Sequence, residues 1–289
     1  MKATKLVAII AMRKGSLMNN SYSALMVDMR HSRCLSDSRR QSAQEDLANA
    51  MDCTNELFKT ELEMPLMFSA GDELQGLFRS TAGAFLAYRF IKILVQTVDL
   101  RGGIGVGEWK TRMQSALSTE QDGSAYHRAR RAIAESEKDK YSDLKIIDVS
   151  GVSREKELCA AGCLEIIDRR NESQRNYCEV VELLRPLMLH DDRDATLSKR
   201  YAELIEARIG KKYGAKSNPS DCAPVALGSS LNLNVDSIRA SHVGLAGQMG
   251  VAMGKTRQGL EKSLRLANVV RERELAAFAV HFLNEMEPS

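Results

Sequence analysis

The sequence has few of the features that mark secreted, membrane-spanning or disordered proteins. Only 5 of its 289 residues are proline, which excludes a proline-rich chain. Its 6 cysteines are scattered without a Cys-x-x-Cys pair, as expected for reduced thiols in a cytosolic protein. No apolar run approaches the ~20 residues of a membrane span, so we predict no membrane-spanning segment and a cytoplasmic location. A formal net charge of +3 excludes a polycation.

The remaining composition is that of a globular protein, with 44% hydrophobic and 27% charged residues. The length leaves room for two domains. The charge is uneven, because residues 195–275 contain 13 basic and 7 acidic side chains. A modest total charge therefore does not exclude a nucleic-acid partner.

Strand-like and helix-like patterns alternate through residues 22–149. The patterns predict strands at 22–29, 66–70, 74–78, 101–109 and 144–149, and helices at 37–60, 81–98 and from a cap at Asp122 or Ser124 to about Lys138. The first six elements follow the β-α-β-β-α-β order of ferredoxin-like folds. Helical patterns then occupy residues 153–214 and 225–283. We predict an α+β fold, in which a ferredoxin-like or palm domain precedes an all-α region ending in a helix-turn-helix.

The predicted domain boundaries follow from these patterns. Residues 1–20 form an N-terminal extension, 21–150 a palm-like domain, 151–215 a helical linker region and 225–289 a helix-turn-helix-like domain. Residues 216–224, rich in Pro, Ser, Asn and Asp, are typical of a linker. Leu158, Leu164, Ile166, Val181, Leu184, Tyr201, Leu204 and Ile205 are the predicted core positions of the linker region.

Three carboxylates form the first candidate site. Asp28 ends the first strand, and Asp72 and Glu73 occupy the predicted hairpin turn. In the expected topology they meet at one edge of the sheet, where carboxylates repel unless a cation joins them. Hard oxygen ligands suit Mg²⁺ or Mn²⁺, which could bridge nucleotide phosphates. The alternative is structural, because turns favour Gly-Asp and strand ends tolerate Asp.

Four motifs in this region resemble the SatD family of bacterial proteins. They are ALMVDMRHSR at 24–33, SAGDELQG at 69–76, RGGIGVG at 101–107 and QDGSAYHRAR at 121–130. The motifs occur in order over about 110 residues, so the resemblance is specific. Membership of this family implies little chemistry.

A more distant resemblance is to the palm-type catalytic domains of diguanylate cyclases and class III nucleotide cyclases. The cyclase motif G-G-D-E-F stands here as AGDEL at 70–74. This resemblance implies that Asp28 and Asp72 are metal ligands and that Glu73 is a ligand or a substrate contact. Residues 123–131 resemble the cyclase stretch G-x-x-V-N-x-A-x-R, which implies catalytic roles for His127 and Arg131. His127 stands at the Asn position of that stretch, and Arg131 stands at the Arg position.

Other residues near the acids are candidate nucleotide contacts. Arg30 and Arg33 follow the first strand and could contact phosphate oxygens, or lie in a solvated loop. Gly71 and Gln75 flank the acidic pair and complete the predicted nucleotide-binding set. Glycines at 102, 103, 105 and 107 leave room for a ligand or another backbone to approach the fourth strand.

The C-terminal region contains a second candidate site. Residues 254–265 (GKTRQGLEKSLR) resemble the turn and recognition helix of helix-turn-helix proteins. Gly254 permits the turn, Thr256 can cap the helix, and Leu260 and Leu264 lie one turn apart. The predicted DNA-binding residues are Lys255, Thr256, Arg257, Gln258, Lys262 and Arg265. An ordinary amphipathic helical hairpin is the alternative.

Two functional hypotheses follow. The first is a DNA-binding regulator whose palm-like domain senses a nucleotide or a metal ion. The second is a Mg²⁺-dependent nucleotide cyclase or nucleotidyltransferase that acts on nucleoside triphosphates. A degenerate palm that serves as a protein-interaction scaffold is a third possibility. Palm cyclases and many helix-turn-helix proteins act as dimers, so we expect a homo-oligomer.

Overall fold

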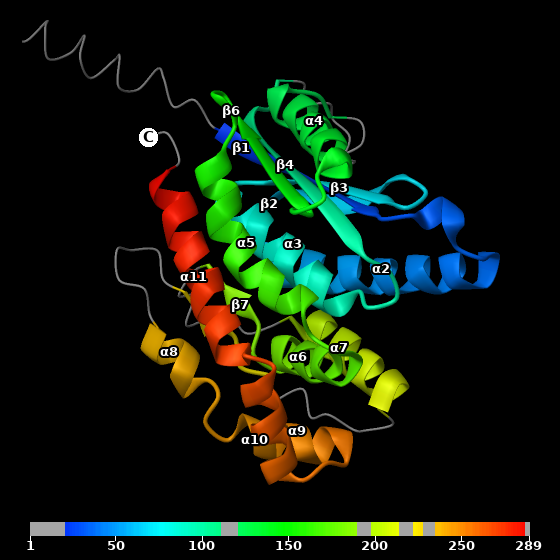
Figure 1. Ribbon diagram of the computed structural model, residues 1–289, viewed down its shortest axis with the longest axis vertical. Coiled ribbons are helices and arrows are strands. Elements are labelled where there is room, and N and C mark those ends of the chain that lie inside the picture. The colour runs from blue at the N-terminus through cyan, green and yellow to red at the C-terminus, as the bar shows by residue number, and fades with distance from the viewer. Residues whose placement is uncertain (1–20, 111–120, 190–197, 214–221, 228–234, 287–289) are drawn as a thin grey trace, which may run out of the picture.

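A mixed six-stranded sheet lies at the centre of the N-terminal region (Figure 1). The computed structural model describes residues 21–110, 121–189, 198–213, 222–227 and 235–286. The predicted extension, residues 1–20, and residues 216–221 of the predicted linker lie outside the described residues. The strands, in chain order, are β1 Ser21–Met29, β2 Leu62–Ala70, β3 Glu73–Phe78, β4 Leu100–Glu108, β5 Leu144–Asp148 and β6 Gly151–Val152.

The strand order across this sheet is β2-β3-β1-β4-β5-β6. β1 pairs antiparallel with both β3 and β4, and β2 pairs antiparallel with β3. β5 is parallel to β4, and the short β6, which the sequence did not predict, is antiparallel to β5. The predicted strand-helix-strand-strand-helix-strand order of the first six elements is present.

Helices cover both faces of the sheet. α2 (Asp37–Leu57) and α3 (Thr81–Leu94) lie on one face, and α4 (Ser124–Lys138) lies on the other (Figure 1). Leu25, Val27 and Met29 of β1 join the core on the α2–α3 side, whereas Ala24 and Met26 join the smaller cluster beneath α4. This alternation is the period of two expected of a strand, and it leaves β1 buried on both faces.

The glycines of β4 let a helix backbone approach the sheet. A Cβ at Gly103 or Gly105 would overlap the backbone of α4 at Ala129. The close neighbour permitted by these glycines is therefore α4. Gly123 is the N-cap of this helix and no side chain caps it, so the prediction that Asp122 or Ser124 is the cap was wrong.

α3 is buried along its whole length, because it lies between the sheet and the C-terminal helices. A helix that is apolar on all sides belongs in a protein interior. Two cations interrupt its apolar sequence, since Arg89 is 1% exposed and Lys92 is 9% exposed. Ser80 caps the helix by accepting a hydrogen bond from Gly83 N at 3.0 Å.

The remaining helices form a layer beside and below α3 (Figure 1). They are α5 Arg154–Asp168, α6 Glu172–Leu184, α7 Lys199–Tyr213, α8 Val235–Ala240, α9 Leu245–Met253, α10 Arg257–Leu266 and α11 Val269–Glu285. α11 packs against α5 and α3, so residues from both ends of the chain contribute to one core. Within the described ranges, no helix has the length and apolar character needed to cross a membrane.

Two predictions for the helical region were wrong. Residues 153–214 are not helical throughout, because β7 (Leu187–Met188) pairs in parallel with β8 (Val225–Ala226) in a separate two-stranded sheet. Leu158, a predicted core residue, is 63% exposed, and Ala160, Cys163 and Ile167 form the buried face of α5 instead. All 6 cysteines are free thiols.

Candidate functional site

The predicted metal ligands lie together at one end of the sheet. β1 and β3 pair so that Asp28 is opposite Glu73. Gly71 has φ 65°, a left-handed conformation that glycine adopts readily, and it makes the tight turn that carries Asp72. Burial raises the pKa of Asp28, and the nearby negative charge of Asp72 raises it further. The hairpin therefore brings the carboxylates to one edge, as the predicted topology requires.

An arginine neutralises the first of these acids. Arg101 of β4 lies opposite Asp28 and donates from Nε and Nη2 to Asp28 Oδ2, at 2.8 and 2.5 Å. Arg101 Nη1 also lies 3.3 Å from Glu137 Oε1 at the end of α4. Burial dominates the raised pKa of Asp28, and the hydrogen bond from Arg101 opposes that effect. The sequence interpretation missed this pair, because it treated Arg101 only as the start of a glycine-rich strand.

The acidic edge does not fit a two-metal site in this arrangement. Arg101 holds one oxygen of Asp28, and Ser69 Oγ donates to Glu73 Oε1 at 2.5 Å. In the part of the chain that the structure describes, no three His, Cys, Asp or Glu side chains form a group that could hold a metal ion. Hydrogen bonds from Arg101 and Ser69 therefore occupy oxygen atoms that Mg²⁺ or Mn²⁺ would need as ligands.

The predicted nucleotide contacts are only partly gathered around the acids. Arg30 forms an ion pair with Asp143, in the segment before β5. Arg33 is exposed in a single 3-10 turn, Ser32–Cys34. Gln75 lies opposite Met26 inside the sheet and is only 2% exposed, so a nucleotide could not reach it without a rearrangement. Gly71 is exposed at the hairpin turn.

Of the two predicted catalytic residues, His127 lies far from the acids. His127 is in the first turn of α4, where Nε2 is 3.0 Å from Asp122 Oδ1, and its side chain is 67% exposed. This turn lies beside Gly107, which pairs with Tyr22 at the opposite end of β1 from Asp28. Tyr22 and Asp28 are six positions apart along β1. At about 3.3 Å per residue, this corresponds to about 20 Å. Arg131 is exposed one turn further along α4. The structure therefore does not bring His127 to the carboxylates.

At the predicted DNA-binding site, two helices are joined by a short turn. α9 ends at Gly254, which has φ 62°, and α10 begins after the N-cap Thr256. Thr256 Oγ1 accepts a hydrogen bond from Gly259 N at 3.3 Å, as predicted for the cap. Gly250 lets the turn approach α9, because a Cβ there would lie 2.9 Å from Lys255 O.

α10 has one buried face and one charged face. Leu260 and Leu264, one turn apart, are buried at 1% and 9% exposure. The six predicted DNA-binding residues are all exposed, namely Lys255, Thr256, Arg257, Gln258, Lys262 and Arg265. Arg257 Nε lies 2.7 Å from Glu261 Oε1, an exposed i,i+4 pair. Lys255, Lys262 and Arg265 make no ion pair with any described residue.

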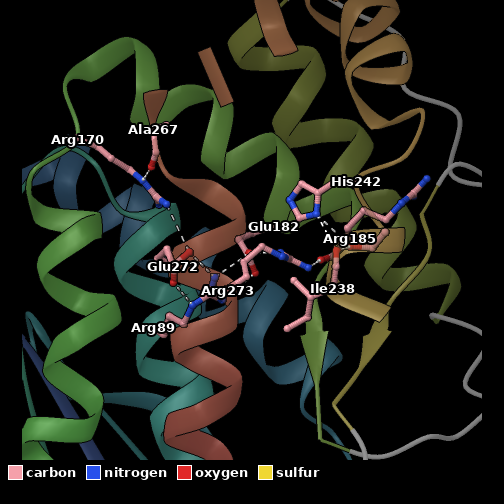
Figure 2. A network of polar contacts seen from close by, with 10 residues as sticks. Arg89, Arg170, Glu182, Arg185, Ile238, His242, Ala267, Glu272 and Arg273 are labelled. Atoms are coloured by element: carbon pink, nitrogen blue, oxygen red, sulfur yellow. Dashed lines mark hydrogen bonds and ion pairs between the residues drawn. The ribbon is translucent and has the colours of Figure 1, made fainter. Parts of the chain in front are cut away.

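A buried polar network, which the sequence interpretation did not identify, connects the sheet region to α9 and α10 (Figure 2). Arg89 of α3 donates to Glu182 of α6 at 2.9 Å and to Glu272 of α11 at 2.6 Å. Arg273 also pairs with Glu182. Arg89, Glu182, Glu272 and Arg273 are each at most 2% exposed. Charged residues within otherwise apolar helices were the one feature of the sequence that indicated such a network. The sequence alone does not show which of these residues pair.

Two arginines extend this network to α9 and to the C-terminal end of α10. Arg170 donates from Nε to the carbonyl oxygen of Ala267, the C-cap of α10, at 3.1 Å. Arg185 donates from Nη2 to Gln248 Oε1 of α9 at 2.6 Å. The position of this helix pair is therefore fixed through hydrogen bonds to the interior of the protein.

These features define a mixed α+β protein with a six-stranded sheet and a helical C-terminal region. The SatD family model matches residues 22–184, which is more than half of the chain. The chain therefore belongs to the SatD family, as the motifs at the sheet edge and in β4 indicated. A search of the curated proteins finds no similar sequence.

Proposed function

We propose that this protein is a DNA-binding regulator that contacts duplex DNA through α10. The observation that carries the proposal is the charged surface of α10 and of the turn before it, where Lys255, Lys262 and Arg265 are exposed without ion-pair partners among the described residues. Phosphate contacts from Lys and Arg supply most of the affinity of such an interface, and they release counterions from the DNA. The capped turn between α9 and α10 supports a helix-turn-helix assignment.

The remaining exposed side chains of α10 are suited to base contacts. Gln258 carries an amide that can make two hydrogen bonds to adenine, and Arg257 can do the same with guanine. Arg257 is paired with Glu261, but both side chains are at least 50% exposed. An exposed i,i+4 pair contributes only about 0.3–0.5 kcal/mol, so it would not prevent Arg257 from binding DNA.

The hydrogen bonds behind α10 support a rigid mode of binding. Arg170 holds the C-terminal end of the helix, and Leu260 and Leu264 hold its apolar face against the protein. A recognition helix held in this way loses little conformational freedom when it binds. Helix-turn-helix proteins often bind as dimers, in which two recognition helices contact half-sites about 34 Å apart. We therefore also propose that this protein binds DNA as a dimer.

The test is the affinity for a duplex measured by fluorescence anisotropy at low salt. Arg257→Ala and Lys262→Ala should each weaken binding. Lys199→Ala is the control, because Lys199 is 93% exposed on α7, in a different part of the protein. Unchanged affinity in both α10 variants would reject the proposal, as would equal weakening by the control.

The alternative proposal is Mg²⁺-dependent chemistry on nucleoside triphosphates at the acidic edge. The antiparallel order β2-β3-β1-β4 and the proximity of Asp28, Asp72 and Glu73 favour this palm-like interpretation. The pairing of Asp28 with Arg101 weighs against it. Product formation from any of the four triphosphates that is lost in Asp72→Asn would support the enzyme, and an inactive wild type would reject it. Nucleotide sensing at this edge and a cytoplasmic location also remain predictions.

A further inference from the structure

A polar cavity lies away from both the acidic edge and α10. Its volume is about 370 Å³, and it lies between the residues that follow β1, the segment before β5, and helices α5 and α6. Small-molecule sites commonly have volumes of about 300–1,000 Å³. The lining includes Arg30, Asp99, Asp143, Asp168 and Arg175. The cavity is therefore large enough and polar enough for a small charged ligand.

The cavity adjoins a smaller recess with a volume of about 30 Å³. Asp99, Asp168 and Arg175 line both spaces, and Arg170 lines the recess. This volume accommodates one or two water molecules. The oxygen atoms of a carboxylate would fit in the same space, whereas an aromatic ring would not.

Arg170 presents an unused hydrogen-bond donor in this buried region. Its side chain is 2% exposed, and its Nη1 has no hydrogen-bond partner. The other nitrogens are engaged, because Nε donates to Ala267 O at 3.1 Å and Nη2 lies 3.4 Å from Glu272 Oε2 (Figure 2). A buried donor without a partner is costly, so an acceptor from a ligand would stabilise it.

Arg175 is the second cation available to a ligand. Its Nε donates to the backbone oxygen of Arg170 at 3.0 Å, which holds the guanidinium at the wall shared by both spaces. Arg175 makes no ion pair with any residue in the described ranges. An arginine fixed by its Nε keeps both terminal nitrogens free for a carboxylate.

Acidic side chains lie in the same cavity. Asp99 makes no ion pair within the described part of the chain, although it lines the same two spaces as Arg175. Lys92 Nζ lies 2.8 Å from Asp168 Oδ1 and 3.1 Å from Asp143 Oδ2, and Arg30 also forms an ion pair with Asp143. Burial raises the pKa of Asp168, and the nearby negative charges of Asp143 and Asp99 raise it further. The positive charge of Lys92 has the opposite effect and lowers this pKa. Among the described residues, Asp99 is therefore the acid of this set that has no ion-pair partner to satisfy its charge.

We propose that this cavity binds a free amino acid, with the carboxylate held by Arg175 and Arg170 and the ammonium group held by Asp99 and Asp168. A simple anion would satisfy the arginines but would be repelled by the two aspartates. A simple cation would be repelled by the arginines. A small zwitterion matches the free donors of the two arginines and the carboxylate of Asp99, which face one cavity without pairing with each other. Asp168, which also pairs with Lys92, supplies a further acceptor for the ammonium group. The site does not depend on the DNA-binding proposal.

The first experiment tests binding to the full-length protein in the absence of DNA. Each of the twenty standard amino acids is added at millimolar concentration in a thermal-shift assay, and any that raise the Tm are measured by calorimetry. Inorganic phosphate is the anion probe. The N-acetyl and amide derivatives of the amino acid that binds test the ammonium and the carboxylate separately. We expect at least one amino acid to bind and both derivatives to bind more weakly.

Variants then locate the site. Arg175→Gln and Asp99→Asn should each weaken binding by about tenfold or more, because each removes a charged hydrogen bond to the ligand. Arg79→Gln is the control, since Arg79 is 61% exposed in its pair with Glu63 and neither residue lines the cavity. Failure of every amino acid to bind would overturn the proposal. Tight binding of phosphate that is unaffected by Asp99→Asn would overturn it in favour of a simple anion site.

Discussion

Arg101 donates two hydrogen bonds to Asp28 across the β1–β4 pair, at 2.8 and 2.5 Å. This ion pair lies where the cyclase resemblance implies a metal ion. A guanidinium and a divalent cation serve the same electrostatic purpose beside a buried carboxylate, because each compensates the charge that burial disfavours. In this SatD family protein, the acidic edge is therefore stabilised by its own arginine.

Removing that arginine should destabilise the protein in a pH-dependent way. Burial already holds the pKa of Asp28 above its usual value, and Arg101→Ala should raise that pKa further. An acid whose folded pKa is raised costs stability once pH exceeds its unfolded pKa. We expect Arg101→Ala to lower the free energy of unfolding by about 1–3 kcal/mol at pH 7 and by less near pH 4.

Urea unfolding at the two pH values is the measurement. Adding Asp28→Asn to Arg101→Ala should recover part of the missing stability, because the buried charge is then gone. The control is Arg79→Ala, since Arg79 is 61% exposed in its pair with Glu63. A destabilisation that does not change with pH would contradict the assigned role of Arg101.

The buried network should be far more sensitive. Burial alone would raise the pKa of Glu182, but Arg273 and Arg89 lower it to about 2. Glu182→Gln leaves two buried guanidinium groups without that partner, and breaking such a pair costs about 3–5 kcal/mol. Because the folded pKa is lowered, this stabilisation is present above about pH 4.5 and is lost as pH falls toward 2.

Chemical denaturation at pH 7 and near pH 3.5 tests this second prediction. The destabilisation caused by Glu182→Gln should be smaller at the lower pH. Glu165→Gln is the matched control, because Glu165 is 61% exposed in its pair with Arg169. Equal stabilities of the two variants would show that the network does not stabilise the fold.

Two glycine substitutions should have opposite effects. Gly105→Ala would place a Cβ against the backbone of Ala125 and Ala129, so α4 would have to move away from β4. We expect a destabilisation of about 1–3 kcal/mol or more. Gly247 lies inside α9, and a Cβ added there would have no neighbour within 4 Å. Because alanine favours a helix more than glycine does, Gly247→Ala should stabilise the protein by up to about 1 kcal/mol. Thermal unfolding of both variants checks the signs, and a stable Gly105→Ala protein would contradict the close packing of α4.

The cap of α10 can be separated from its contacts with DNA. Thr256→Ala removes the acceptor for Gly259 N and should cost about 0.5–2 kcal/mol, whereas Thr256→Ser keeps the hydroxyl and should cost little. Unfolding curves of the two variants test the cap. Equal destabilisation in both would mean that the hydroxyl does not stabilise the helix.

Local patterns predicted most of the secondary structure, and long-range pairing accounts for much of what they missed. The α9–α10 turn was predictable because Gly254, Thr256 and Leu260 act within a few residues of one another. The short β7–β8 pairing was not, since it joins segments almost 40 residues apart. The carboxylates could be placed at one edge from strand order, but the partner of Asp28 comes from a strand 73 residues later. His127 follows a cyclase-like spacing, yet the orientation of α4 directs it to solvent.

The salt dependence of duplex binding tests the central claim most directly. Fluorescence anisotropy would give the affinity of the wild type and of the Lys255→Ala, Lys262→Ala, Arg265→Ala triple variant at several salt concentrations. If these cations bind phosphates, the wild-type affinity should fall steeply with salt, and the triple substitution should reduce the slope by about 0.9 for each phosphate that is no longer neutralised, or up to about 2.7. Failure of the wild type to bind, or the same slope and affinity for both proteins, would contradict DNA binding through α10.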